Sequence, residues 1–177
     1  MSQRSDRHST RCQVWDYTSA AGYYITICTH RRQPIFASSQ GAEKRLTLGG
    51  ILATACWLAL PSHFPGVCLD EFTVMPDHVH GVLVLLDAPR WWALDPTGAS
   101  APPPGPISGS IGSIVGSYKS AVTKLIHRAA TDDVMRKAPV WHRNYHDRII
   151  RDAREFDAKR LYTINNWNRW MDKHRQR

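Results

Sequence analysis

The residues best suited to chemistry in this sequence are two histidines, His78 and His80, separated by one valine. They follow a Met-Pro-Asp corner between two apolar, β-forming runs, residues 67–74 and 78–86, and this pattern predicts an antiparallel hairpin. Side chains alternate along a strand, so both imidazoles point to one face. Neutral imidazole is a good ligand for divalent cations, but two ligands do not close a metal site. An inactive, exposed pair is an equally good interpretation in a chain with nine histidines.

The run after these histidines is apolar on both faces. One face continues through Val82, Val84 and Leu86, and the other carries Val79, Leu83 and Leu85. A strand that is apolar on both faces is covered on both sides. We therefore predict a central strand with the histidines at its exposed start.

A second candidate feature is the pair Tyr162 and Asn166, four residues apart. Asp152 and Glu155 have capping-box spacing and predict a helix from 152 to about 166 or beyond, with the pair on one face. If Asn166 joined the two histidines on a metal, Tyr162 would lie beside it. A phenol is a poor nucleophile at neutral pH and typically attacks a phosphodiester polarised by a cation, giving a covalent phosphotyrosine. From spacing alone, a core tyrosine and a helix-end asparagine remain the preferred interpretation.

Other regular elements are predicted from composition and periodicity. β-Branched and aromatic residues favour strands at 22–29 and 147–151. Residues 48–60 have apolar side chains at helical spacing (Ile51, Leu52, Ala55, Leu58 and Ala59) and stop at Pro61. A helical stripe begins at Ile111 and is flanked by hydroxyl and lysine side chains. That polar face suits a phosphate backbone, and a merely solvated face is an almost equal alternative.

The formal net charge of +8 favours a polyanionic partner. Seven Trp and six Tyr accompany this charge, and any outside the core could stack on unpaired bases. Hydrophobic residues at 42% and charged residues at 21% fit a soluble globular protein, and no apolar run is long enough to cross a membrane. The four cysteines lack Cys-x-x-Cys pairing, which indicates reduced thiols and a cytoplasmic location.

The chain of 177 residues is long enough for one domain with a real core. The polar, basic composition of residues 1–18 predicts a flexible N-terminal arm without the apolar segment of a secretory signal. The remaining residues, 19–177, predict a single domain with a Pro-rich insertion at about 87–110, because Ala-Pro-Pro-Pro-Gly-Pro cannot continue regular structure.

The frame Met-Pro-Asp-His-Val-His-Gly resembles the histidine–hydrophobe–histidine motif of the single-tyrosine HUH transposases, and in particular the REP-associated tyrosine transposase group. Three further stretches fit this group in the same order, at residues 24–32, 112–120 and 141–151. The C-terminal Tyr-Thr-Ile-Asn-Asn matches the group's Tyr-x-x-x-Asn. The family usually has Pro after this Asn, whereas this chain has Trp167, so we expect the helix to continue and to shift Asn166.

This resemblance implies an α+β fold: a ferredoxin-like antiparallel sheet with helices packed on one face and the catalytic tyrosine on the C-terminal helix. It implies a divalent metal, Mg²⁺ or Mn²⁺, held by His78, His80 and Asn166, with Tyr162 as the nucleophile. The implied activity is transposition by cleavage and rejoining of single-stranded or hairpin DNA, leaving a 5′-phosphotyrosine and a free 3′-hydroxyl. Such a protein would act as a monomer or a homodimer.

Other interpretations compete with this one. A histidine-triad nucleotide hydrolase also begins with His-x-His but needs a third histidine where this chain has Val82. A binding-only relative would grip hairpin DNA or RNA through its basic face without chemistry, and the intact motif residues count against it without removing it. Tyr145 is the rival nucleophile, but it lacks a neighbouring ligand at helical spacing. The candidate contacts to a DNA backbone are Arg31, Arg32, Lys119, Lys124, Arg143, Arg148 and Arg151.

Overall fold

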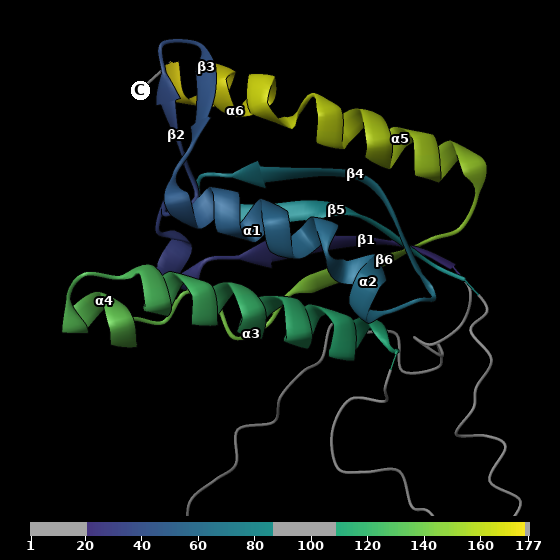
Figure 1. Cartoon of the computed structure of the whole chain (residues 1–177). Coiled ribbons are helices and arrows are strands. Elements are labelled where there is room, and N and C mark those ends of the chain that lie inside the picture. Colours follow the sequence, from purple (N-terminus) through teal and green to yellow (C-terminus); the bar gives the residue numbers. More distant parts are fainter. Residues whose placement is uncertain (1–20, 87–108, 176–177) are drawn as a thin grey trace, which may run out of the picture.

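Four antiparallel strands form the central sheet of the computed structural model, which describes residues 21–86 and 109–175 (Figure 1). Their order across the sheet is β4-β5-β1-β6. The strands are β1 (Ala21–Cys28), β4 (Val67–Met75), β5 (His78–Leu85) and β6 (His146–Ile150). Ignoring a small added hairpin, the chain follows the predicted β-α-β-β-α-β order with this ferredoxin-like strand arrangement.

The register of the central strands fixes which residues share a face. β5 lies between β4 and β1, with His80 opposite Thr26 and His78 opposite Cys28. The histidine face continues into a small cluster with Tyr24, whereas Val79 and Leu83 are fully buried in the main core on the other face. The predicted hairpin, its central position and its alternation are therefore confirmed.

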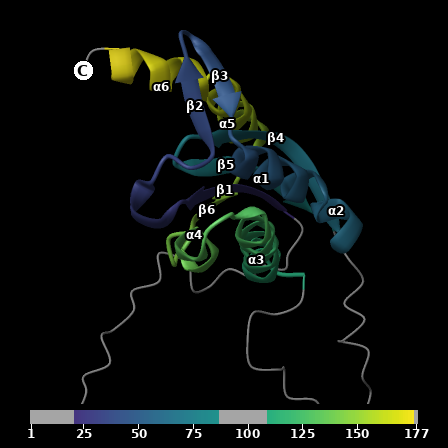
Figure 2. The same ribbon diagram turned by 60° about the vertical axis from the view of Figure 1, so that its left-hand side comes forward.

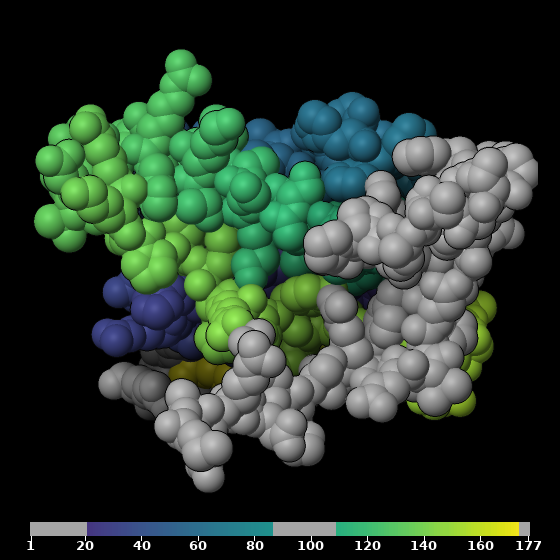
Figure 3. Space-filling view, turned by 90° about the horizontal axis from the view of Figure 1, so that it is seen from below, coloured from purple at the N-terminus to yellow at the C-terminus, as the bar shows by residue number. Residues whose placement is uncertain are grey.

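Helices lie on both sides of this sheet (Figure 2), not on one face as the resemblance implied, because the C-terminal helices cover the histidine face. The main core lies under the helices of one side: α1 (Leu48–Leu58), α2 (Leu60–His63), α3 (Ile111–Ala129) and α4 (Asp133–Lys137). Figure 3 looks onto this side, where α3 and α4 form much of the surface. The C-terminal helices, α5 (Ala153–Ile164) and α6 (Asn166–Arg175), cross the opposite side of the sheet.

The two core helices, α1 and α3, test the buried faces that were predicted from apolar periodicity. On α3 the predicted stripe is buried, including Ile114, Tyr118 and Val122. On α1 the helix itself is confirmed, but it ends at Leu58, and Pro61 lies in the first turn of α2 instead of ending the helix. Two of the predicted apolar positions, Ile51 and Leu58, are more than half exposed, and the buried positions are Gly50, Ala53 and Trp57. Because α1 is apolar on most sides, its periodicity did not indicate which face would be covered.

A two-stranded hairpin, β2 (Ala37–Gln40) and β3 (Glu43–Leu46), was not predicted from the sequence. Its strands are short and mostly polar, so they carry little strand signal. The hairpin stands beside α6 (Figure 1), and the indole Nε1 of Trp167 donates a hydrogen bond of 3.0 Å to the carbonyl of Ala42 in its turn. This contact ties the C-terminal helix to the hairpin.

The predicted basic arm at residues 1–18 and nearly all of the Pro-rich insertion lie outside the described residues. Within the described ranges, none of the helices has both the length and the apolar character needed to cross a membrane. Cys28, Cys56 and Cys68 are free thiols, as their spacing predicted.

Candidate active site

The fold brings His78, His80 and Tyr162 together, although the histidines and the tyrosine are distant in sequence. The ring centroids of the two histidines are 5.1 Å apart, and the His80 and Tyr162 centroids are 5.6 Å apart. The histidines begin the central strand β5, and Tyr162 lies in the last turn of α5 where that helix crosses the sheet. Tyr162 is 39% exposed, so its ring remains open to solvent and to a large substrate.

His80 is buried, and its Nε2 atom has no hydrogen-bond partner in the described part of the structure. Burial, followed by the positive charges of His78, Lys44 and Lys159, lowers the pKa of His80 to about 3. The imidazole is therefore neutral at physiological pH, with a lone pair available for a cation. An unpartnered buried nitrogen is costly in a folded protein, and a metal ligand is a role that would satisfy it.

His78 is oriented by the aspartate that precedes it. Its Nδ1 lies 2.7 Å from Oδ1 of Asp77, and the other carboxylate oxygen lies 3.3 Å from Nη1 of Arg32. Burial would raise the pKa of Asp77, but the hydrogen bond and charge of His78, together with Arg32, lower it overall. When Nδ1 carries the proton, Nε2 is left as the ligating atom, which is the usual arrangement of a carboxylate behind a metal-bound histidine.

Asn166 is 6% exposed and is the first residue of α6. The helix continues past it, as expected from Trp167, with one irregular residue at Asn165. The backbone hydrogen bond from Asn165 to the carbonyl of Leu161, 3.1 Å long, closes the last turn of α5. Asn166 is therefore buried at the junction of α5 and α6, four residues after Tyr162.

Tyr24 is a further member of the site that sequence reasoning missed. Its ring centroid lies 5.7 Å from that of His80 and 6.2 Å from that of Tyr162, with an edge-on geometry to the latter. Burial raises the pKa of the Tyr24 hydroxyl, so this phenol stays protonated and serves as a wall of the site. Tyr24 lies on β1, opposite Val82 of β5. Once this register is known, strand alternation places Tyr24 on the same face as the histidines.

Three cations near the site were also missed. Lys44 Nζ donates a hydrogen bond of 2.8 Å to Oγ1 of Thr73, the residue paired with His80 on β4. Lys159 Nζ lies 4.6 Å from the centroid of the Tyr24 ring, and Arg169 Cζ lies 5.2 Å from that of Tyr162. Helical spacing from Tyr162 could have indicated the last two, whereas Lys44 depends on the hairpin that was not predicted.

The predicted DNA-binding residues do not form one surface. Arg31 and Arg32 lie in a short 3-10 turn at His30–Arg32, near the start of β5, and both adopt left-handed backbone angles. The ammonium of Lys119 is already used within the protein, because it donates to the carbonyls of His142 and Arg143 at 2.8 and 3.0 Å. Burial also lowers the pKa of Lys119.

The other predicted basic residues are more dispersed. Arg148 lies in the middle of β6, opposite Tyr24, and forms an ion pair with Glu155. Arg151 follows that strand, at the end of the sheet far from His78. Arg143 and Lys124 are exposed on the side covered by α3. A contact to one short DNA segment would therefore use only part of the set.

Tyr145, the rival nucleophile, packs against the main core on the α1–α3 side. Tyr162 lies on the other side of the sheet, with the histidines. The geometry thus favours Tyr162 as the tyrosine that could react beside a cation.

The donor set at this site fits a divalent metal. Two imidazole nitrogens and an amide oxygen would come from His78, His80 and Asn166, and the unpartnered Nε2 of His80 is the observation that supports them. Among the described residues no three His, Cys, Asp or Glu side chains gather as a metal site, so closing this one depends on the amide and on oxygens of substrate or water.

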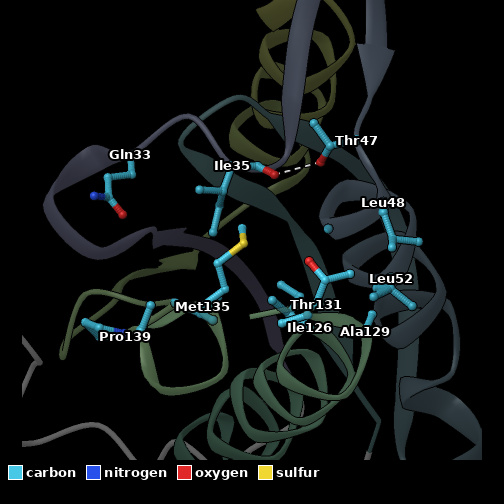
Figure 4. Close-up of a pocket in the computed structure, with 14 residues that line it drawn as sticks. Gln33, Ile35, Thr47, Leu48, Leu52, Ile126, Ala129, Thr131, Met135 and Pro139 are labelled. Carbon is cyan, nitrogen blue, oxygen red and sulfur yellow. Dashed lines mark hydrogen bonds between the residues drawn. The ribbon is translucent and has the colours of Figure 1, made fainter. Parts of the chain in front are cut away.

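An apolar pocket of about 550 Å³ lies apart from these residues (Figure 4). Its walls come from α1, the end of α3, α4 and the segment before β2, including Leu52, Ile126 and Met135. The hydroxyl of Thr47 at its rim donates to the carbonyl of Ile35 at 2.6 Å. None of the predicted catalytic or metal-binding residues lines it, so it is not part of the candidate active site.

Comparison with known proteins identifies a relative by sequence. An uncharacterized protein of Haemophilus influenzae is 31% identical over 166 residues, which cover 93% of this chain and 89% of that protein. The chain belongs to the same family as this protein. No family model matches the sequence.

A solved structure has a similar fold. The structure of a REP-associated tyrosine transposase bound to a REP hairpin superposes with a TM-score of 0.53 and 13% identity, covering 94% of this chain and 72% of that one. The chain has the REP-associated tyrosine transposase fold. The fold predicted from the motifs, an antiparallel sheet with packed helices and a C-terminal tyrosine helix, is thereby confirmed.

Proposed function

We propose that this protein is a metal-dependent single-stranded DNA endonuclease and strand transferase, a transposase that acts through a covalent 5′-phosphotyrosine. The observation that carries the proposal is the position of Tyr162, whose ring lies 5.6 Å from that of His80, a buried histidine with an unpartnered Nε2. A solvent-exposed phenol beside an unpartnered imidazole nitrogen fits nucleophilic attack on a large substrate.

The proposed reaction exchanges one ester bond for another. The Tyr162 oxygen attacks the phosphorus of a DNA phosphodiester and forms a tyrosine–phosphate bond. The bond from phosphorus to the 3′-oxygen breaks, and the proton lost by the phenol is balanced by one gained at the 3′-oxygen. The reverse attack by a 3′-hydroxyl rejoins the strand and restores the tyrosine, so no external energy source is consumed.

His78, His80 and Asn166 are the residues proposed to hold Mg²⁺ or Mn²⁺. When bound, such an ion would polarise the phosphodiester and favour loss of the phenolic proton. Asp77 keeps the His78 ring in position through its 2.7 Å contact with Nδ1. Tyr24 closes the inner wall of the site behind Tyr162 and limits water on that side.

The proposed substrate is single-stranded or hairpin DNA. The superposed REP-associated tyrosine transposase is bound to a REP hairpin, and the net charge of +8 on this chain suits a polyanion. Arg31 and Arg32 are exposed beside the histidines and are well placed for backbone contacts.

The second candidate is a binding-only relative that holds hairpin nucleic acid without cutting it. The dispersed basic residues are compatible with this role. The observation against it is the unpartnered buried His80, because a protein that does no chemistry has no use for an unsatisfied imidazole at this position.

The deciding experiment is a denaturing gel of the protein with several end-labelled single-stranded hairpin oligonucleotides, with Mn²⁺ or with chelator. Three proteins are compared: wild type, Tyr162→Phe and Tyr145→Phe. Removing the hydroxyl of a partly exposed tyrosine leaves the ring contacts in place and changes stability by no more than about 0.5 kcal/mol. We expect a metal-dependent covalent adduct in wild type and Tyr145→Phe, and none in Tyr162→Phe.

Binding of the same oligonucleotides should be nearly unchanged in Tyr162→Phe. An adduct that persists in this variant would move the nucleophile elsewhere. Tight, salt-sensitive binding by wild type with no adduct on any of the hairpins would support the binding-only role instead.

A further inference from the structure

Two basic side chains, one on α5 and one on α6, lie on the side of these helices that carries Tyr162. Lys159, Asn166 and Arg169 stand three residues before, four after and seven after the tyrosine. Residues at these spacings share one side of a helix. Arg169 lies on α6, beyond the irregular residue Asn165, and its contact with the Tyr162 ring places it on the tyrosine's side of the two helices.

Both cations lie over aromatic rings of the site. Arg169 Cζ is 5.2 Å from the centroid of Tyr162, and Lys159 Nζ is 4.6 Å from that of Tyr24. A ring face attracts the charge of a cation but does not satisfy its directional N–H donors. Arg169 is thus positioned over the ring of the candidate nucleophile and Lys159 over the neighbouring Tyr24 ring, with donors still available.

Two arginines near these helices are neutralised by carboxylates. Arg160 Nε lies 2.8 Å from Oδ1 of Asp70, and Arg148 is paired with Glu155. Across residues 21–86 and 109–175, no carboxylate pairs with Lys159 or Arg169. Two unneutralised cations on the tyrosine's side of the two helices indicate a site for an anion.

We infer that Lys159 and Arg169 form a phosphate clamp that holds the scissile phosphodiester against Tyr162. This inference rests on the proposed function and adds the residues that contact the reacting group from the helix side, opposite the histidines. Arg169 would bind the non-bridging oxygens through its planar N–H groups, and Lys159 would supply a point charge from the inner side. Both would stabilise the extra negative charge that develops at phosphorus during attack.

The first test measures phosphate contact without chemistry. Binding of a single-stranded oligonucleotide is followed by fluorescence anisotropy over a range of salt concentrations, with chelator and in the Tyr162→Phe background. Losing one phosphate contact should reduce the slope of log affinity against log salt by about 0.7. We expect this reduction for Arg169→Gln and for Lys159→Gln.

Arg154→Gln is the matched control. Arg154 is exposed on the same helix, eight residues before Tyr162, and its substitution removes the same charge. We expect its salt slope to equal that of the background protein. Equal slopes for Arg169→Gln and Arg154→Gln would overturn the clamp.

The second test measures the rate of adduct formation at saturating DNA. Arg169→Gln should slow this step by roughly 100-fold, as expected when a charge donor to a transition state is lost. Arg154→Gln should leave the rate unchanged, and Arg169→Lys should recover part of it because the charge is kept. An Arg169→Gln rate equal to wild type would overturn the assigned role at the reacting phosphate.

The two tests separate the clamp from the proposed function. If wild type forms no adduct but the salt slope still falls in Arg169→Gln, the phosphate contact holds and the endonuclease proposal fails. If wild type forms an adduct and neither readout responds to Arg169→Gln or Lys159→Gln, the endonuclease stands and the clamp is wrong.

Discussion

Replacing Gly81 with alanine should destabilise the protein, because β5 and β4 approach too closely there for a side chain. Gly81 pairs with Phe72 just after a register shift in β4 between Leu69 and Phe72. A Cβ at position 81 would lie 2.5 Å from the Phe72 Cβ and 2.9 Å from its Cα. Neither atom is the flexible end of a side chain, so one of the two strands must move.

The expected cost follows from what has to shift. The Phe72 ring stacks on Trp57 with centroids 5.6 Å apart, so displacing it disturbs the main core. Overpacking of this kind costs about 1–3 kcal/mol. For a protein of this size, each kcal/mol lowers the melting temperature by roughly 2–4 °C. Because Gly81 follows His80, the movement should also slow adduct formation.

Gly116→Ala is the control with the opposite sign. Gly116 is exposed within α3, and a Cβ there meets nothing within 4 Å. Replacing a helical glycine with alanine at an open position should stabilise the protein by about 0.5–1 kcal/mol. Urea titrations followed by circular dichroism measure both variants. Equal stability of Gly81→Ala and wild type would refute the reasoning about strand approach.

Three further predictions concern the metal, the tyrosine helix and DNA. Asp77→Asn should weaken Mn²⁺ binding by about 10–100-fold in calorimetric titrations, because the carboxylate that orients His78 is lost; an unchanged affinity would remove Asp77 from the site. Asp152→Ala should destabilise the protein by about 1 kcal/mol in urea, since Oδ1 of Asp152 accepts from the Glu155 amide at 2.7 Å as the N-cap of α5; Asp157→Ala, an exposed position within that helix, is the control and should change stability little. Binding of single-stranded DNA by wild type should weaken with salt by about 0.7 log units per neutralised phosphate for each tenfold increase in salt; a flat titration would refute nucleic-acid binding.

The capping box shows what a local signal can predict. Asp152 and Glu155 indicated the start of α5, and Asp152 caps its first turn as expected, whereas Glu155 accepts from the amide of Arg151, one residue before the N-cap, at 3.1 Å. Helix starts depend on groups within a few residues, so the sequence contains the whole interaction. The alternation of His78 and His80 was predictable for the same reason.

The faces of α1 and the basic surface were not predictable in this way. The buried face of α1 includes Gly50, where a Cβ would lie 2.0 Å from the carbonyl oxygen of Phe36. That close approach depends on how two distant segments pack. The predicted basic residues likewise separated, with Lys119 used to hold a loop and Arg148 paired to a glutamate.

Spacing and motif frames were enough to identify the pairs His78–His80 and Tyr162–Asn166, because each pair is set by the local period of a strand or a helix. Only the tertiary structure decided that α5 crosses the histidine face, bringing the Tyr162 ring to 5.6 Å from that of His80. It also decided which cations stay unneutralised near that hydroxyl, because ion pairing depends on carboxylates from other elements, such as Asp70 on β4 beside Arg160. Contacts between distant segments arise from packing and register, which local sequence patterns do not contain.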